Sequence, residues 1–261
     1  LGELWSIFSF LMPGYLPPYK NFCARFEKPI VQEEDANAVR RLNQLTGPFI
    51  LRRMKADVLR ELPPKTENVH RIELDTEQRK LYLAAVVDAR EKLRAAKPED
   101  KMAVFAVLMR LRQICCDPRL VADNWSGGSA KLDACMELVT AAVEGGHRIL
   151  LFSQFTSMLD LLAQRLDEAG VSHFTLQGST PKPMRAERVR RFNAGEASVF
   201  LISLRAGGTG LNLTAADIVI HYDPWWNVAA QNQATDRAYR IGQKNPVQVY
   251  KLIAQDTIEE K

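Results

Sequence analysis

The stretch VFLISLRAGGTGLNLTAADIVIHYD, residues 199–223, holds two short apolar runs on either side of a glycine-rich segment. Runs of this length that are apolar at every position are typical of strands buried on both faces of a sheet. From residue 130 onward, amphipathic helical stretches alternate with further strand-like runs at 148–153, 173–177 and 247–253. We therefore predict an α/β fold in which helices cover both faces of a parallel sheet.

The chain before residue 129 has a less regular pattern, and we expect it to be mainly helical. An alternating run, NVHRIEL at 68–74, predicts a strand. Helices are predicted at about 75–96 and 99–116, and Asp75 could cap the first of them. The apolar segment 1–16 is expected to be a buried helix, because a membrane span needs ~20 apolar residues.

The composition is that of an ordinary globular protein, with 46% hydrophobic and 25% charged residues. The net charge of +4 is uneven, since basic residues gather at 40–60 and 179–205. Such patches favour a polyanionic partner, although a solvated helix face is the commoner explanation of either patch alone. The four cysteines form no CxxC and the histidines are scattered, so we expect no metal site and expect Cys115 and Cys116 to be buried thiols.

Unusual residues follow four of the predicted strands, at the end where each strand finishes. They are SQF at 153–155, QGST at 177–180, SLRAGGTG at 203–210 and DPWWN at 223–227. Ligands of open α/β sheets bind beyond the carboxyl ends of the strands. We therefore expect a site at this edge of the sheet.

The glycine-rich segment after residue 204 has two explanations. Its glycines could let backbone N–H groups approach an anion, or could form a tight strand-to-helix turn. A dinucleotide-binding fingerprint fails because Leu213 replaces its third glycine, and the chain contains no GxxxxGK[ST] phosphate loop. The QGST segment and the basic helix after it offer hydroxyls, backbone amides and arginines, which suit nucleic-acid phosphates.

Two pairs of large side chains also allow two explanations each. Arg237 and Arg240, within QNQATDRAYRIGQ at 231–243, are three residues apart and would share one face of a helix. They could neutralise charge on a phosphoryl group in transfer, or form salt bridges to nearby carboxylates. Of Trp225 and Trp226, one could belong to the core while the other lies against a sugar or base.

Taken together, these segments resemble the second RecA-like lobe of Swi/Snf-type ATPases in helicase superfamily two. LGELWSIFSFLMPGYL resembles the stretch after motif III of the first lobe, FILRRMKADVLRELPPKTE the inter-lobe region, and LRQICCDPRL the helical insertion. The later segments are similar, in order, to motifs IV (ILLFSQF), IVa (LQGSTPKPMRAERVRRFN), V (LISLRAGGTGLNL), Va (ADIVIHYDPWWN) and VI (QNQATDRAYRIGQ). The resemblance runs nearly end to end.

The resemblance implies a role for each candidate residue. Arg237 and Arg240 would be catalytic arginine fingers, acting on ATP whose Mg is held by the first lobe, which would carry the P-loop and the Asp-Glu box. Together with these arginines, Gly208, Gly210 and Gln231 would contact the nucleotide. Contacts to double-stranded DNA would come from Gln154, Gly178, Ser179, Thr180, Arg205, Gly207, Gly208 and Trp226, the indole that matches motif Va.

The resemblance also implies a division of the chain and a set of partners. We expect a helical protrusion and inter-lobe linker at 1–62, a strand and helical insertion at 63–128, and a RecA-like helicase C-terminal domain at 129–261. The partners would be double-stranded DNA, the first RecA-like lobe of the same protein, and a DNA-bound protein such as RNA polymerase or a nucleosome, with no membrane. Lean loops favour a prokaryotic protein of the cytoplasm, associated with the nucleoid; a eukaryotic one would be nuclear.

Two other functions remain open on the sequence alone. A strand-separating or RNA-directed helicase is disfavoured by the DRAYRIGQ ending of motif VI. A stand-alone nucleic-acid-binding or regulatory module would lack turnover. A P-loop and an Asp-Glu box upstream of Leu1 would identify an enzyme instead.

Overall fold

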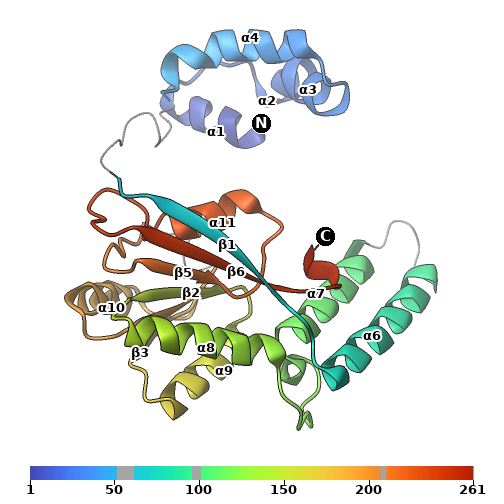
Figure 1. The fold of residues 1–261 in the computed structure, drawn as a ribbon. Helices are drawn as coiled ribbons and strands as arrows, with labels where there is room; N and C mark the ends of the chain where they lie inside the picture. Colours follow the sequence, from blue (N-terminus) through green and yellow to red (C-terminus); the bar gives the residue numbers. More distant parts are fainter. Residues whose placement is uncertain (52–61, 96–100, 205, 207–209, 261) are drawn as a thin grey trace. The chain divides into compact units, whose positions relative to one another are not determined.

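The computed structural model describes residues 1–51, 62–95, 101–204, 206 and 210–260. The chain divides into two compact units, residues 1–60 and 61–261. The described part of the first unit is mainly helical, as predicted (Figure 1). Its elements are α1 Gly2–Leu11, α2 Tyr19–Phe22, a π-helical turn at Cys23–Glu27, α3 Lys28–Gln32, α4 Ala36–Thr46 and a 3-10 turn at Gly47–Phe49.

A small apolar core holds the first unit together. It contains Phe8, Leu16, Phe22, Phe26 and Leu42. The apolar segment at the start of the chain is a helix, as expected, but the expectation that it is buried is wrong. Only Phe8 of α1 is buried, and Phe10 is 85% exposed. The first unit has few helices, and they cover only one stripe of α1. The apolar residues of α1 occur around the whole helix, so most of them stay exposed.

The second unit is built on a sheet whose strands all run parallel, in the order β1-β6-β5-β2-β4-β3 among the described residues (Figure 1). The strands are β1 Lys65–Ile72, β2 Ile149–Ser153, β3 His173–Leu176, β4 Val199–Ser203, β5 Ile218–His221 and β6 Val247–Ala254. The predicted fold class is confirmed. The strand before residue 129 joins the same sheet at its edge, beside β6.

Helices cover both faces of this sheet, which explains why its central strands are apolar at every position. They are α8 Ala130–Glu144, α9 Thr156–Glu168, α10 Lys182–Ala194 and α11 Val228–Thr235. Successive residues of a strand point to opposite faces. Accordingly Leu151 belongs to the core formed with α8 and α9, whereas Leu150 belongs to the core formed with Phe192 of α10 and Ala234 of α11.

Two long helices, α6 Thr76–Ala95 and α7 Lys101–Cys116, pack beside the end of β6 around a third core. Asp75 caps α6 as predicted, because its carboxylate accepts a hydrogen bond of 2.8 Å from the Gln78 amide. The predicted thiols Cys115 and Cys116 are buried and unpaired, and burial raises the pKa of Cys115 to about 12. Short 3-10 helices at Pro118–Leu120 and Ile258–Glu260 complete this region.

Candidate functional site

The carboxyl ends of parallel strands lie at one edge of a sheet, and four neighbouring strands of this one end in the segments singled out from the sequence. Those strands are β5, β2, β4 and β3, which are adjacent in that order. The loops after them begin near Tyr222, Gln154, Leu204 and Gln177 respectively. The structure therefore brings the predicted segments to a common edge, the place where α/β sheets bind ligands.

The loop after β3 is held in one conformation by its own hydroxyl and by α10. The Gln177 amide donates to Thr180 Oγ1 at 3.0 Å. The Arg185 guanidinium donates to the carbonyl oxygens of Thr180 and Gly178, both at 2.8 Å. Gly178 and Ser179 are exposed. The loop therefore presents a fixed backbone with its serine hydroxyl at the surface.

The basic face of α10 is partly occupied within the protein. Arg188 donates to the carbonyl oxygen of Thr175, and Arg191 pairs with Glu196 at 2.6 Å. The Arg191 guanidinium also lies over the Phe174 ring. Three arginines of this cluster, Arg185 included, thus have structural partners, which reduces the charge offered to a polyanion; Lys182 and Arg190 are exposed.

The glycine-rich loop after β4 is described only in part. Arg205, Gly207 and Gly208, predicted to contact DNA or the nucleotide, lie outside the described residues. Gly210 is exposed and has φ +45°, in the left-handed region that favours glycine. After it, Leu213 is buried and its amide donates to the Arg237 carbonyl at 3.0 Å. This bond ties the glycine-rich loop to the segment that carries the two arginines.

Arg237 and Arg240 do not lie on a helix, so that part of the prediction is wrong. α11 ends at Thr235, and turns follow it. The Arg237 carbonyl accepts from Leu213, and the Ala238 carbonyl accepts from the Gln243 side chain at 3.2 Å. Beyond Thr235 the amides of Arg237 and Ala238 donate to carbonyls three residues earlier, as in turns, and the Leu213 and Gln243 contacts hold the segment in that form.

The two guanidinium groups lie close to one another and have few partners. Arg237 is 7% exposed, and its Nε has no hydrogen-bond partner among the described residues. Burial lowers the pKa of Arg237 and the neighbouring Arg240 charge lowers it further, while the Asp236 charge acts in the opposite direction. Arg240 donates from Nη1 to the Leu211 carbonyl at 3.3 Å. Within the described residues no ion pair joins either arginine to a carboxylate, so the alternative of structural salt bridges is not found.

The paired tryptophans lie just beyond β5, and neither is a core residue. Trp226 is 54% exposed and Trp225 is half-buried. The Trp226 ring stacks on Phe105 of α7, with centroids 6.0 Å apart and planes 11° apart. The Trp225 amide donates to Gln231 Oε1 at 3.3 Å, so the buried Gln231 side chain, predicted to contact the nucleotide, also braces this loop. Phe105 was not predicted, since nothing in its helical pattern distinguishes it.

Gln154, the first residue beyond β2, is joined to the loop after β5. Its amide lies 3.2 Å from both carboxylate oxygens of Asp223. Its side-chain Oε1 accepts from Arg112 of α7 at 3.1 Å, and its Nε2 is buried with no partner among the described residues. Burial raises the pKa of Asp223, against the effects of Ser153, Lys131 and Arg112. Sequence reasoning missed Arg112; its only signal was a basic residue within the apolar pattern of its helix.

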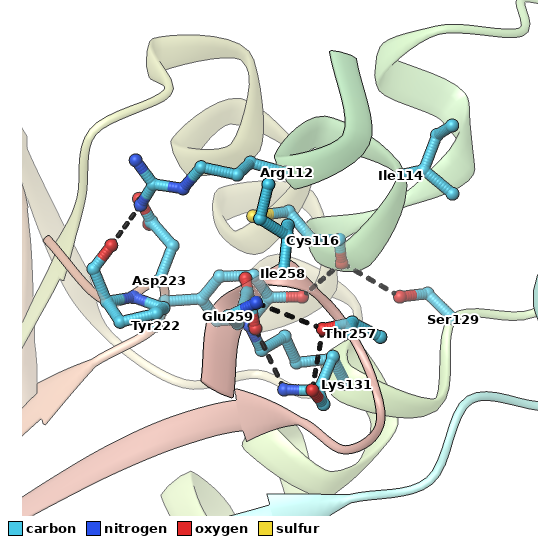
Figure 2. A network of polar contacts seen from close by, with 12 residues as sticks. Arg112, Ile114, Cys116, Ser129, Lys131, Tyr222, Asp223, Thr257, Ile258 and Glu259 are labelled. Carbon is cyan, nitrogen blue, oxygen red and sulfur yellow. Dashed lines mark hydrogen bonds and ion pairs between the residues drawn. The ribbon is translucent and has the colours of Figure 1, made fainter. Parts of the chain in front are cut away.

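A second polar group lies deeper, at the start of α8 (Figure 2). Lys131 and Glu259 are both fully buried and their charged atoms are 2.5 Å apart. Lys131 also lies over the ring of Tyr222, whose hydroxyl donates to the Cys116 carbonyl at 2.8 Å. Burial alone would lower the pKa of Lys131, but the charge of Glu259 outweighs it and the pKa is raised. This pair fixes the segment after β6 to α8 and was not predicted.

Neither a metal cluster nor a membrane helix is found in the described part of the chain. Its histidine, cysteine, aspartate and glutamate side chains do not gather in groups of three or more suited to a metal ion. None of its helices combines the length and the apolar character needed to cross a bilayer.

Two family models match the chain, one in each half. Residues 1–120 match the SNF2-related domain, and residues 130–242 match the helicase conserved C-terminal domain. Together they span almost the whole sequence and meet close to the boundary between the helical region and α8.

Individual relatives agree with these models. The chain is 42% identical over 270 residues to a putative ATP-dependent helicase/translocase, YwqA, of Bacillus subtilis, and 40% identical over 265 residues to an uncharacterized ATP-dependent helicase of Mycoplasma pneumoniae. Each match covers 100% of this chain, but 29% and 25% of the respective relative. The chain thus spans between a quarter and a third of the length of these curated relatives.

Solved structures give the same answer. The SWI2/SNF2 ATPase core of Sulfolobus solfataricus in complex with dsDNA is 34% identical, with a TM-score of 0.67, over 98% of this chain and 55% of that one. The C-terminal domain of the same ATPase is 29% identical, with a TM-score of 0.64, over 75% of this chain and 82% of that one. The chain therefore belongs to the SWI2/SNF2 family of ATPases in helicase superfamily two, and it corresponds to the C-terminal part of their ATPase core.

Proposed function

We propose that this chain is the second motor lobe of an ATP-dependent translocase on double-stranded DNA, and that Arg237 and Arg240 act as its arginine fingers. The observation that carries the proposal is the buried Arg237 guanidinium, whose Nε has no partner among the described residues. A buried polar atom without a hydrogen-bond partner is costly, and groups of this kind are concentrated in active sites. Arginine fingers neutralise the charge that develops on a phosphoryl group in transfer.

The residues at this edge suit one side of a nucleotide site. Arg237 and Arg240 supply two neighbouring positive charges, and Gln231 and Gly210 lie on the segments that flank them. Gly208, proposed for the same site, lies outside the described residues. The chain has no GxxxxGK[ST] loop, so the phosphates and Mg would be held by the first lobe of the same protein. When bound there, Mg would neutralise charge on the β- and γ-phosphate oxygens.

The same edge supplies candidate contacts to the DNA backbone. Gly178, Ser179 and Thr180 form a fixed, exposed loop beside α10, and Gln154 has a side-chain N–H without a partner among the described residues. Trp226 is 54% exposed although Phe105 and Arg112 pack on its ring. Arg205, Gly207 and Gly208 are proposed for the same role from the sequence alone. The Sulfolobus relative in complex with dsDNA supports this choice of partner.

The division of the chain into a protrusion and linker (1–62), a helical insertion (63–128) and a RecA-like domain (129–261) is part of the same proposal. The match to bacterial relatives supports a prokaryotic protein of the cytoplasm that acts on nucleoid DNA. A protein bound to that DNA, such as RNA polymerase, is the proposed obstacle to its movement.

The proposal is tested by ATP hydrolysis of the full-length protein that carries this chain. Hydrolysis should be stimulated by double-stranded DNA, and the chain expressed alone should release no phosphate above a buffer control. Adding the first lobe as a separate polypeptide should restore DNA-stimulated turnover. A full-length protein that binds DNA but never hydrolyses ATP would instead identify a binding or regulatory module.

A further inference from the structure

Arg112 of α7 joins three segments that are distant in the sequence. Its Nη1 donates to Gln154 Oε1 at 3.1 Å, in the loop after β2, and its Nη2 donates to the Pro224 carbonyl, in the loop after β5. Its guanidinium lies 3.8 Å from the carboxylate of Asp223, beside it in Figure 2. Its Cζ is 5.2 Å from the centre of the Trp226 ring. A single guanidinium therefore links the helical insertion to two loops at the carboxyl edge of the sheet.

This arrangement determines which atom of the Gln154 side-chain amide faces Arg112 and which faces away from it. A guanidinium has five N–H donors and no acceptor, so it can only face the amide oxygen. The amide NH₂ is then left for another partner, and Gln154 Nε2 has none among the described residues although it is buried. An oriented N–H donor of this kind suits a phosphate oxygen.

Arg112 also supports the exposed indole. Its charge lies over the Trp226 ring, and Phe105, seven residues earlier on α7, stacks on that ring with planes 11° apart. A ring held by a cation and an aromatic plane has its orientation fixed before any ligand arrives. Both groups that hold it come from α7.

Arg112 is unsuited to contact DNA directly. Both of its Nη atoms already donate to protein oxygens, whereas Gln154 Nε2 has no such partner among the described residues. Its partner Asp223 is fully buried, and buried ion pairs of this kind are often no more stable than an apolar replacement. Its arrangement is therefore better explained by orientation of its neighbours than by stability alone.

We propose that Arg112 is a positioning residue through which the helical insertion sets the DNA affinity of the motor lobe, by orienting the Gln154 amide and the Trp226 ring. This inference deepens the proposed function and rests on it. It predicts that a change at Arg112 alters the DNA concentration needed for half-maximal stimulation of ATP hydrolysis more than the turnover at saturating DNA.

The test uses the full-length protein and a double-stranded DNA of fixed length. Arg112→Gln should raise the half-saturating DNA concentration about tenfold, the effect of losing one hydrogen bond to a charged group, with turnover at saturating DNA changed much less. Arg112→Lys keeps the charge but loses the two-pronged geometry, and should give a partial rescue. Arg110→Gln, an exposed neighbour on α7, is the matched control and should behave as wild type.

A second variant separates orientation from stability. Arg112→Gln removes one of the cations that stabilise the buried Asp223 carboxylate, so the single variant could be poorly folded. Adding Asp223→Asn removes that charge and should recover the melting temperature. The half-saturating DNA concentration of the double variant should stay raised. A double variant that responds to DNA like the wild type would overturn the inference.

The failure of this inference can be told from failure of the proposed function. A wild-type protein whose hydrolysis is not stimulated by DNA contradicts the proposed function. A wild-type protein that is stimulated, alongside Arg112 variants with an unchanged half-saturating concentration, contradicts only the role of Arg112.

Discussion

Arg112 and Arg237 are buried to nearly the same degree, at 5% and 7% exposed, yet their guanidinium groups are used differently. Arg112 donates to two oxygens, faces a carboxylate and covers an indole ring. Arg237 Nε has no partner within the described residues, and burial lowers the pKa of the group. Burial alone therefore does not identify a functional arginine; the distinction lies in whether its donors are already taken.

The difference has an energetic meaning. Removing a charge from water costs several kcal/mol per ion, and only good partners offset that cost. Arg112 has such partners, whereas Arg237 also faces the repulsion of Arg240. We infer that the Arg237 site is retained at the expense of stability, as is common where a group awaits a partner from another part of the protein.

The largest effect should come from the arginines themselves. In the full-length protein, Arg237→Ala or Arg240→Ala should reduce DNA-stimulated hydrolysis by ~10³-fold or more, because in the proposed function each supplies charge that stabilises the phosphoryl group in transfer. DNA affinity should be nearly unchanged. Phosphate release and DNA binding are measured on the same preparations.

A thermal melt of each variant is the control for this experiment. Normal turnover per folded molecule, together with a lower melting temperature, would show that the two arginines serve the fold and not the chemistry.

The second prediction compares the two buried arginines by the same substitution. Arg112→Met should lower the free energy of unfolding by about 3 kcal/mol, since it removes one of the two cations, with Lys131, that stabilise the buried Asp223 carboxylate. Arg237→Met should leave the free energy of unfolding unchanged or raise it, because it replaces a buried charge whose Nε has no partner among the described residues with an apolar chain. Denaturant unfolding of the two full-length variants measures both values. Equal losses of unfolding free energy in the two variants would show that the two buried arginines do not differ in their contribution to stability.

Most of the fold could be predicted from the sequence because its strands are buried on both faces. Residues 149–153 and 199–203 are apolar or small at every position and fully or almost fully covered, so their pattern leaves little choice. The exposure of α1 could not be predicted in this way. Its apolar pattern predicts burial, but the pattern does not say how many neighbouring helices are present to cover it, and only Phe8 is buried.

Only the position of the candidate site at one edge of the sheet could be predicted from the sequence, because it follows from the parallel arrangement of the strands. That topology brings the residues after four strands to one edge, and the segments chosen from the sequence lie there. The end of α11 at Thr235 was not predictable, because the turns that follow it are held by a contact to Leu213, more than twenty residues earlier. Arg112 was missed for the same reason: its partners Gln154 and Asp223 are distant in sequence.

The third prediction extends the comparison to His221, a buried imidazole that stays neutral. His221 is fully buried, its Nε2 lies 2.9 Å from Thr235 Oγ1, and burial lowers its pKa to about 3. A depressed pKa means that stability is complete above the unfolded value and is lost as the pH falls toward the folded value. Relative to His221→Gln, the wild type should lose about 2 kcal/mol of unfolding free energy between pH 7 and pH 5. If the unfolding free energy of both proteins changes by the same amount between pH 7 and pH 5, His221 is not the group that causes the change.

The smallest expected effect concerns the ring that Arg112 covers. Trp226 is 54% exposed, and Phe105 stacks against it, so only part of the indole remains for DNA. Stacking of a base on an aromatic ring is worth ~1–3 kcal/mol, and we expect the lower end of that range here. Trp226→Ala should therefore weaken binding of double-stranded DNA about fivefold while leaving hydrolysis at saturating DNA nearly intact.

Trp225→Ala is the matched control for this weak effect, because that ring is half-buried and its amide is bonded to Gln231. It should lower the melting temperature more than it changes DNA affinity. The decisive measurement is the amount of ATP consumed for each third strand displaced from a DNA triplex. This amount should rise in Trp226→Ala, because weaker binding to DNA allows the lobe to slip back between cycles. If Trp226→Ala instead consumes the normal amount of ATP for each strand displaced, and Trp225→Ala does not, then Trp225 is the indole that contacts the duplex and Trp226 serves only to pack against α7.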